Sequence, residues 1–342
     1  MGLRTRNMQS ISQTCAIRVR TVRRSISIVE KTKGGMQIVV LGASGFVGQH
    51  LIKSLLDRYP SARIVAVSRK ITKLAFAPSV RVIQAGLGAN PDLMTACRDA
   101  SAIIHLAWST TPSISNVAPL NDVMDNLVGS VAFLEAISRD FRKRLIFMSS
   151  GGTVYGQPIN VPIPETHPIR PITSYGIAKF GVEEYVELYG TKHGFDYTIL
   201  RAANLYGPGQ LQKNGQGVIP AILNSLKNDD PFVMWGDGSA IRDYVYVSDV
   251  VDAILKAVER PQAIGNRFNI GSGDGNSLLE VLEAIEEITQ RRVQINQRPT
   301  RSSDVPVNVL DISKARKLLD WQPRVGLKDG LRRTIEHELC LA

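Results

Sequence analysis

From residue 36 onward, short apolar segments alternate with longer segments in which apolar positions recur at helical spacing. The apolar segments predict buried strands at residues 37–41, 63–67, 81–83, 102–106 and 144–148. The helical spacing predicts helices at 48–56 and 121–138. Because continuous apolar strands separated by helices need cover on both faces, we predict an α/β fold with a doubly wound parallel sheet.

The pattern changes after about residue 200. Gly, Pro and Asn are frequent in 204–220 and 228–240, and helices are predicted at 250–259 and 278–289. Ser277 and Glu280 fit a capping box at the start of the second of these helices. We therefore expect a large domain over 36–203 and a smaller C-terminal lobe over 204–342, with 241–265 returning to the large domain.

The net charge of +10 is concentrated at one end of the 342-residue chain. Residues 1–35 contain eight basic side chains and one acidic side chain, a charge of +7. The rest has an ordinary charge balance without a basic stripe interleaved with aromatics, so no nucleic-acid partner is expected. The longest apolar runs are too short to span a bilayer, so no membrane partner is expected either.

Residues 1–35 are rich in Arg and Ser and nearly free of acids. We interpret them as a disordered or artefactual extension, with an organelle transit peptide as the alternative. Cys15, Cys97 and Cys340 are scattered and form no metal-binding or redox spacing. Reduced cysteines, no metal site and a cytoplasmic location are therefore expected.

A glycine-rich turn, Gly42-Ala-Ser-Gly45-Phe46-Val47-Gly48, joins the first predicted strand to the first helix. Three glycines at this spacing permit a tight turn and the close approach of a pyrophosphate to the helix N-terminus. The turn predicts a dinucleotide cofactor bound by these residues, which makes 36–203 a dinucleotide-binding domain.

The second predicted strand ends in Ser68 and Arg69, where an acid usually binds the ribose diol of NAD. An arginine can bind the 2′-phosphate of NADP instead. The alternative is that Arg69 is a solvated loop residue. These residues therefore leave NADP open beside NAD, the expected cofactor.

Tyr175 and Lys179 lie four residues apart, on one face of a predicted helix. A nearby ammonium stabilises a phenolate and lowers the pKa of the phenol towards neutrality. Tyr175 is therefore a candidate base that removes a hydroxyl proton while hydride leaves the same carbon.

With the glycine turn, this pair resembles the extended short-chain dehydrogenase/reductase family, in its nucleotide-sugar epimerase/dehydratase branch. The resemblance covers nearly all of 36–342 and implies a Rossmann fold with a substrate-binding C-terminal lobe. Further segments that carry it are His105-Leu-Ala107, Asn126, 149–156 (Ser-Ser-Gly-Gly-Thr-Val-Tyr-Gly), Arg201-Ala-Ala-Asn204-Leu-Tyr-Gly-Pro208, 242–249 (Arg-Asp-Tyr-Val-Tyr-Val-Ser-Asp) and Arg301-Ser-Ser-Asp304.

The resemblance also implies roles for single residues and a homodimer packed through the helices 121–138 and 174–192. Lys179 would touch the nicotinamide ribose as well as tune Tyr175. The other cofactor residues are Ala107 and Asn126. A UDP-sugar would be bound through its diphosphate, ribose and base by Asn204, Arg242, Arg301, Asp304 and Trp235.

Several positions depart from the family pattern. Gly151 stands three places before Val154, where the family has its catalytic hydroxyl, so Ser150 or Thr153 is expected to replace it. Gly86 stands where an Asp commonly meets the adenine ring. Asn308 matches a position that gates sugar size, and an Asn there is expected to admit N-acetyl groups.

Gly152 and Thr153 occupy the places where related dehydratases carry an Asp-Glu pair and related decarboxylases a Glu. Epimerisation needs only one base and a nicotinamide, so we expect a UDP-hexose 4-epimerase acting on UDP-glucose and UDP-galactose or on their N-acetyl forms. The first alternative is an NAD(P)-dependent nucleotide-sugar reductase or dehydrogenase, which releases its nicotinamide. The second is a non-catalytic protein that binds NADP or a nucleotide, which Gly151 keeps open.

Overall fold

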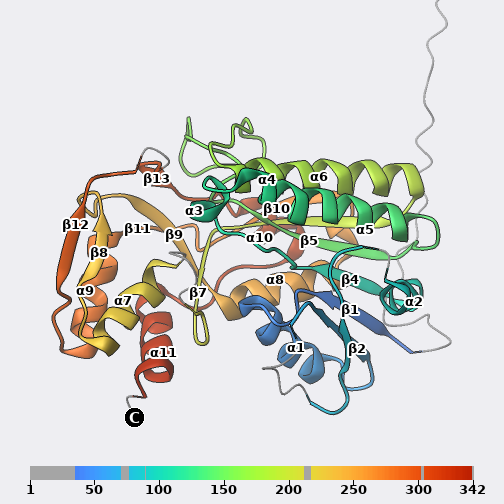
Figure 1. The fold of residues 1–342 in the computed structure, drawn as a ribbon, viewed down its shortest axis with the longest axis horizontal. Helices are drawn as coiled ribbons and strands as arrows, with labels where there is room; N and C mark the ends of the chain where they lie inside the picture. The colour runs from blue at the N-terminus through green and yellow to red at the C-terminus, as the bar shows by residue number, and fades with distance from the viewer. Residues whose placement is uncertain (1–34, 71–76, 89, 212–216, 302–303, 341–342) are drawn as a thin grey trace, which may run out of the picture.

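A seven-stranded, fully parallel sheet forms the centre of the molecule in the computed structural model, which describes residues 35–70, 77–88, 90–211, 217–301 and 304–340 (Figure 1). The strand order is β10-β6-β5-β4-β1-β2-β3. The strands are β1 (Gln37–Leu41), β2 (Arg63–Ser68), β3 (Arg81–Gln84), β4 (Ala102–His105), β5 (Arg144–Ser150), β6 (Asp196–Ala202) and β10 (Asn266–Ile270).

Helices cover both faces of this sheet, and alternate strand residues point into two separate cores. In β1, Ile38 and Val40 face a core shared with α1 (Phe46–Arg58) and α8 (Val247–Glu259). Val39 and Leu41 face a core on the opposite side of the sheet. That second side is covered by α2 (Pro91–Asp99), α5 (Gly129–Ser138) and α6 (Ser174–His193). The predicted α/β Rossmann fold is confirmed.

The predicted helix over 121–138 is present but not uniform. It consists of α4 (Pro119–Asp122), a π-helical stretch over Val123–Val128 and then α5. The short α3 (Pro112–Ser115) precedes it. A π-helical turn inside a helix commonly accompanies a functional site. Asn126, an expected cofactor residue, lies buried within this turn.

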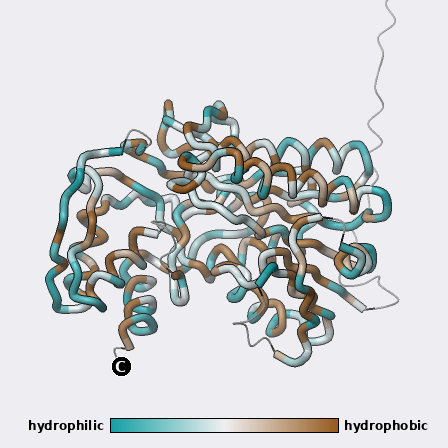
Figure 2. The backbone as a smooth tube through the Cα atoms, in the orientation of Figure 1, coloured by the Kyte–Doolittle hydropathy of each residue, from teal (hydrophilic) through white to brown (hydrophobic). Residues whose placement is uncertain are grey.

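The C-terminal lobe holds a small sheet in which β9 (Ile241–Tyr246) pairs with β7 (Asn204–Tyr206), β11 (Gly275–Ser277) and β13 (Val307–Asn308). A second pair joins β8 (Phe232–Trp235) to β12 (Ile295–Arg298). Figure 2 shows hydrophilic residues along the outer edge of this lobe, where β12 is exposed. Its helices are α7 (Val218–Asn228), α9 (Leu278–Thr289) and α11 (Leu327–Leu339).

Two segments from the C-terminal half of the chain belong to the large sheet or pack on it. They are the stretch from α8 through the 3-10 turn Pro261–Ala263 to β10, and α10 (Ser313–Leu319), which packs on β10. Strand β9, within the expected returning segment 241–265, belongs to the small sheet. The exact division into 36–203 and 204–342 stays a prediction.

The predicted basic extension lies outside the described residues, apart from Gly35. Within the described ranges, no helix is long and apolar enough to cross a membrane.

Candidate active site

The glycine turn leads from β1 into α1 and has space only for glycine at two positions. A Cβ atom on Gly42, whose φ is 81°, would lie 2.7 Å from the backbone nitrogen of Ala107. A Cβ atom on Gly48 would lie 2.5 Å from the carbonyl oxygen of Gly42. The turn therefore brings the start of α1 against the end of β4.

The N-terminus of α1 fits a pyrophosphate. Gly45 is the N-cap and provides no side-chain hydrogen bond, and the first turn carries no acidic side chain. The amides of Phe46, Val47 and Gly48 are thus left to a ligand, and the helix dipole favours an anion there. This cradle is where the residues of the chain would hold the cofactor phosphates.

At the end of β2, the Ser68 hydroxyl lies 2.5 Å from that of Ser44 and also accepts a hydrogen bond from the amide of Lys70. The Arg69 side chain is 62% exposed and lies 3.7 Å from Asp125. A Cβ atom on Gly86 would meet its methylene groups at 3.8 Å. Ser68, Arg69 and Gly86, which the sequence assigns to the ribose and adenine, thus share one surface.

Helix α6 carries the Tyr175–Lys179 pair, and the indole of Trp108 joins it. The Lys179 Nζ lies 3.8 Å from the Trp108 ring centroid and donates a hydrogen bond of 2.7 Å to the Met148 carbonyl oxygen. The rings of Trp108 and Tyr175 meet edge to face at 5.6 Å. The side chains of Tyr175 and Lys179 on α6 and of Trp108, just after β4, therefore form one compact cluster that is anchored to the backbone of β5.

The electrostatics of this pair differ from the sequence expectation. Burial lowers the pKa of Lys179 to about 7, against the opposing effect of Glu183 and Asp122. Burial and the charge of Asp122 raise the pKa of Tyr175 above its usual range. The pKa of Tyr175 in the protein alone thus shifts opposite to the expected lowering, and the tuning of Tyr175 by Lys179 in the cofactor complex stays a prediction. The lysine ammonium lies 5.7 Å from the Tyr175 ring centroid and is held by Met148 and Trp108 instead.

The loop after β5 explains the missing hydroxyl. A Cβ atom on Gly151 would lie 2.5 Å from a methyl group of Leu310 and 3.1 Å from the Arg201 carbonyl oxygen. The place of a Gly151 side chain is therefore filled by the core, not by the site. A Cβ atom on Gly152 would instead lie 3.9 Å from the Ser150 hydroxyl and 4.0 Å from the Asn204 amide oxygen. The Ser150 hydroxyl and the Asn204 amide oxygen thus both lie beside Gly152.

Two further polar atoms beside this loop have no hydrogen-bond partner among the described residues: the Thr153 hydroxyl and the Asn308 amide oxygen, both buried. The Asn308 amide group donates to the Gly151 carbonyl oxygen at 3.3 Å. Asn308 therefore contacts the catalytic loop directly, with one acceptor atom left over for a ligand.

The residues expected to bind the diphosphate are spread over the lobe. The Asn204 amide donates to the Asp243 carbonyl oxygen, and Arg242 follows on β9 next to Asn308 on β13. The guanidinium of Arg301 stacks on the ring of Trp235 at 4.0 Å. The amide of Asp304 donates to the carbonyl oxygen of Arg301 at 3.1 Å, and the charge of Asp304 acts on Arg242, whose pKa is lowered mainly by burial.

The comparisons with known proteins agree on the family. The sequence pattern of the NAD dependent epimerase/dehydratase family matches residues 38–271. The chain belongs to this family. It is 35% identical over 301 residues to a putative UDP-glucose 4-epimerase of Methanocaldococcus jannaschii, covering 87% of this chain and 97% of that protein.

A dTDP-4-dehydro-6-deoxyglucose reductase of Escherichia coli is 29% identical over 315 residues, which cover 89% of this chain and 98% of the reductase. The crystal structure of UDP-glucose 4-epimerase from Thermotoga maritima with UDP-glucose superposes with a TM-score of 0.82 at 33% identity. The match covers 88% of this chain and 98% of that chain. NAD is the cofactor of the family, and the uncapped glycine cradle at α1 fits its pyrophosphate.

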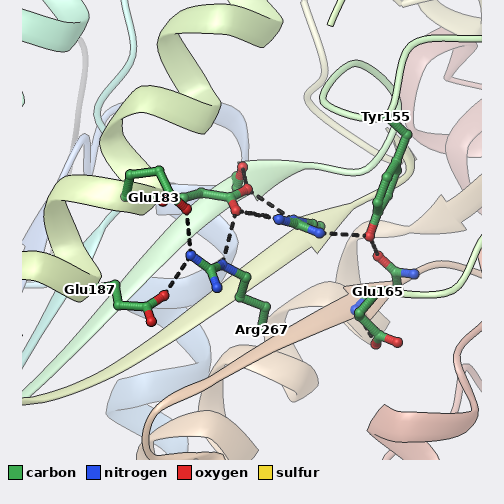
Figure 3. A network of polar contacts seen from close by, with 9 residues as sticks. Tyr155, Glu165, Glu183, Glu187 and Arg267 are labelled. Carbon is green, nitrogen blue, oxygen red and sulfur yellow. Dashed lines mark hydrogen bonds and ion pairs between the residues drawn. The ribbon is translucent and has the colours of Figure 1, made fainter. Parts of the chain in front are cut away.

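Next to the strand end that carries the catalytic loop lies a polar network that was not predicted from the sequence (Figure 3). Glu183 binds Arg201 at 2.6 Å, accepts a hydrogen bond from the Ser149 hydroxyl and lies 3.4 Å from Arg267. Arg201 continues to the hydroxyl of Tyr155 at 3.0 Å. Because this network joins α6 to β5 and β6, it fixes the catalytic loop against the helix of Tyr175.

Two residues that the sequence prediction missed, Glu183 of this network and Trp108 of the Tyr175–Lys179 cluster, do have a signal in the sequence. Glu183 follows Lys179 at helical spacing, on the same face of α6. Trp108 directly follows the motif that ends in Ala107, and a large aromatic residue there has to meet the neighbouring strand ends. Neither position carries an obvious role until the fold brings β4, β5 and α6 together.

Proposed function

We propose that the chain is a UDP-sugar 4-epimerase, which oxidises and reduces C4 of a UDP-hexose with a nicotinamide that stays bound. The observation that carries this proposal is the Tyr175–Lys179 pair beside the glycine cradle, next to a loop with Gly152 and Thr153 where a second acid–base group would stand. One base and one hydride acceptor suffice for epimerisation, whereas elimination of water requires an additional acid. The similarity to a putative and to a solved UDP-glucose 4-epimerase, over nearly the whole length of each, supports the same reaction.

Tyr175 is the base that removes the proton of the 4-hydroxyl. Tyr175 lies in the first turn of α6 and is, as a whole residue, partly exposed. Ser150 is the hydroxyl that orients the sugar, because its side chain faces the same place as Asn204. Thr153, with a buried hydroxyl that lacks a partner among the described residues, is the second candidate.

Bound NAD would accept the hydride from C4 and return it to the opposite face of the ketose. Gly42, Gly45 and Gly48, with the amides of Phe46 and Val47, would hold its pyrophosphate. Ser68 and Arg69 would lie at the adenosine ribose, and Ala107 and Asn126 would be further cofactor residues. The positive charge of oxidised nicotinamide also opposes the effects that raise the pKa of Tyr175.

The substrate diphosphate would be held by Asn204, Arg242 and Arg301, with Asp304 beside them. Arginines suit this role because a guanidinium binds two phosphate oxygens at once. Trp235, 42% exposed, offers a flat surface at which the uracil base would lie. Arg301 must exchange its contact with Trp235 for the ligand. Asn308, small and with a free acceptor, would admit the N-acetyl group of a substituted sugar.

A reductase is the second candidate, because a reductase of another nucleotide sugar is among the relatives. The surface around Arg69 also fits the 2′-phosphate of NADP, a cofactor that is commonly released after each cycle. The two candidates differ in whether the nicotinamide leaves. A protein that only binds nucleotides is disfavoured by the retained Tyr175 and Lys179.

The epimerase is also proposed to be a homodimer. Large apolar side chains are exposed on α4, the π-helical turn and α6, which contact one another: Leu120, Met124, Val128, Ile177 and Leu188. Such a patch on adjacent helices is typical of a subunit interface. Light scattering should give the mass of two chains, and Leu188→Glu with Ile177→Glu should give one. A monomeric wild type would contradict the interface.

The function is tested by an NMR assay with UDP-glucose, UDP-galactose and their N-acetyl forms, each with NAD and with NADP. We expect interconversion of at least one pair at C4. Tyr175→Phe should lower kcat by about 100-fold or more, because the base is lost. Tyr59→Phe is the matched control, since that hydroxyl binds Glu259 at 2.6 Å, far from the site.

Stoichiometric consumption or reduction of nicotinamide without interconversion would move the protein to the reductase function. Retention of activity in Tyr175→Phe would remove Tyr175 as the base. Activity on the unsubstituted sugars only would refute the role of Asn308.

A further inference from the structure

Asp122, at the end of α4, is a carboxylate with no solvent exposure. Its oxygens accept hydrogen bonds from the Thr110 hydroxyl, from the Asn126 amide at 2.8 Å and from the Ser174 hydroxyl at 2.8 Å. All three donors are neutral. Among the described residues, Asp122 takes part in no ion pair, and its charge acts on Tyr175 and Lys179.

Residues 115–116, which precede Asp122 in the chain, contact the first turn of α6. The amide of Ser174 donates to the Asn116 side chain at 2.9 Å, and the amide of Tyr175 donates to the Ser115 hydroxyl at 3.0 Å. Side chains from 115–116 therefore complete the cap of α6, in which the hydroxyl of the N-cap residue Thr173 accepts only the amide of Gly176. Asp122 adds a third contact through the hydroxyl of Ser174, directly before Tyr175.

On the other side, Asp122 fixes the segment after Ala107. The Asn126 amide that binds Asp122 also donates to the Thr110 hydroxyl at 3.1 Å, and its oxygen accepts the amide of Ser109 at 2.8 Å. This segment includes Trp108, whose ring supports both Tyr175 and Lys179. One carboxylate thus ties together the two chain segments from which the Tyr–Lys–Trp cluster is built.

We propose that Asp122 is a positioning residue for the epimerase reaction, which aligns the first turn of α6 and imposes a fixed negative charge on the Tyr175–Lys179 pair. This inference rests on the proposed function. It assigns a second role to the π-helical turn, because Asn126 then supports the carboxylate rather than only the cofactor.

The charges that face the pair come from several elements. Lys179 is faced by Glu183 from its own helix, by Asp122 from α4 and by His105 from β4, whose pKa burial lowers to about 3, so that the imidazole is neutral. Tyr175 is faced by Lys179 and by Asp122. Asp122 is therefore the carboxylate that acts on both members, and it favours the neutral phenol together with the charged lysine.

The test is the phenolate absorbance of the NAD-loaded enzyme as a function of pH, with NAD-loaded Tyr175→Phe subtracted to isolate Tyr175. In Asp122→Asn, which keeps the size of the side chain, the midpoint should fall by about one pH unit. Asp99→Asn, an exposed carboxylate at the end of α2, should leave it unchanged. Since this readout needs no turnover, it tests Asp122 even if the proposed function fails.

Ser174→Ala separates alignment from charge, because it removes one contact to Asp122 and leaves the carboxylate in place. We expect kcat to fall about 10-fold, with KM and the phenolate midpoint unchanged. An unshifted midpoint in a folded Asp122→Asn, as judged by circular dichroism, overturns the electrostatic part. Should Asp122→Asn not fold, an unchanged kcat in Ser174→Ala overturns the positioning role.

Discussion

The Tyr175–Lys179 end of the site is held by buried contacts before any ligand is bound, whereas the residues assigned to the diphosphate make few contacts with one another. Lys179 is 3% exposed and is fixed by Met148 and Trp108. Arg301, by contrast, rests on the partly exposed ring of Trp235 at 4.0 Å. Both ends belong to one candidate site, yet only one of them is preorganised.

The difference follows from what each end has to do. Proton transfer requires fixed geometry and an adjusted pKa, and the cost of burying Lys179 is met by the fold. A diphosphate carries its own charge, so it can draw arginines from separate segments into place. Changes at the preorganised end should therefore alter kcat and pH dependence, whereas changes at the other end should alter KM.

Lys179→Met should have the largest effect, because it should lower activity while raising the stability of the protein at low pH. We expect kcat to fall by about 100-fold or more. The pKa of Lys179 is about 7 in the folded protein, below its ordinary value of about 10.4 in the unfolded chain. Burial of the charged form therefore costs most below pH 7, and this cost disappears as the pH rises towards the unfolded value.

The variant should consequently be more stable than the wild type at pH 6, with a melting temperature higher by about 5 °C, and this gain should shrink by pH 9. Thermal unfolding at both pH values measures it. Lys53→Met, an exposed lysine on α1, serves as the control. A gain that is the same at both pH values would show that Lys179 is not buried as an ammonium.

The catalytic loop gives the next largest effect. Ser150→Ala should lower kcat about 10- to 100-fold, because the hydroxyl that orients the sugar is lost. Gly151→Ser should restore nothing in that background and should destabilise the protein by about 1–3 kcal/mol, since its Cβ atom meets Leu310. Steady-state kinetics and urea unfolding of the single and double variants measure both. Rescue of kcat by Gly151→Ser would show that the hydroxyl that orients the sugar acts from position 151.

Arg301→Gln should show the smallest change in turnover. KM for the UDP-sugar should rise about 10- to 50-fold, while kcat stays within about 2-fold, because the lost contact is made equally in ground and transition states. Arg291→Gln on the same lobe, where the arginine lies 3.6 Å from Asp229, should change neither. A fall in kcat without a change in KM would place Arg301 at the reacting carbon.

The sequence predicted the parts of the molecule whose pattern is local. The strands of the Rossmann sheet, the capping box at Ser277 and the glycine turn follow from apolar periodicity and backbone sterics. The π-helical turn around Asn126 was not predicted, because apolar periodicity marks this stretch as helical but carries no signal for the change in backbone pattern.

The electrostatics of the site could not be predicted either. The spacing of Tyr175 and Lys179 indicates a shared helix face but not how deeply the ammonium is buried or that Trp108 covers it. Likewise, the position of Gly151 in the motif suggests a missing hydroxyl, and only the packing shows that a side chain at this position would meet Leu310. These properties depend on residues far apart in the chain.

The central claim, that hydride leaves C4 and returns to the same carbon while Tyr175 handles the proton, is tested most directly with a UDP-sugar deuterated at C4. The account predicts an epimerised product that retains the deuterium at C4, with no label in solvent and none in free nicotinamide. Deuterium recovered in released nicotinamide, or lost to water, would contradict an epimerase that keeps its cofactor.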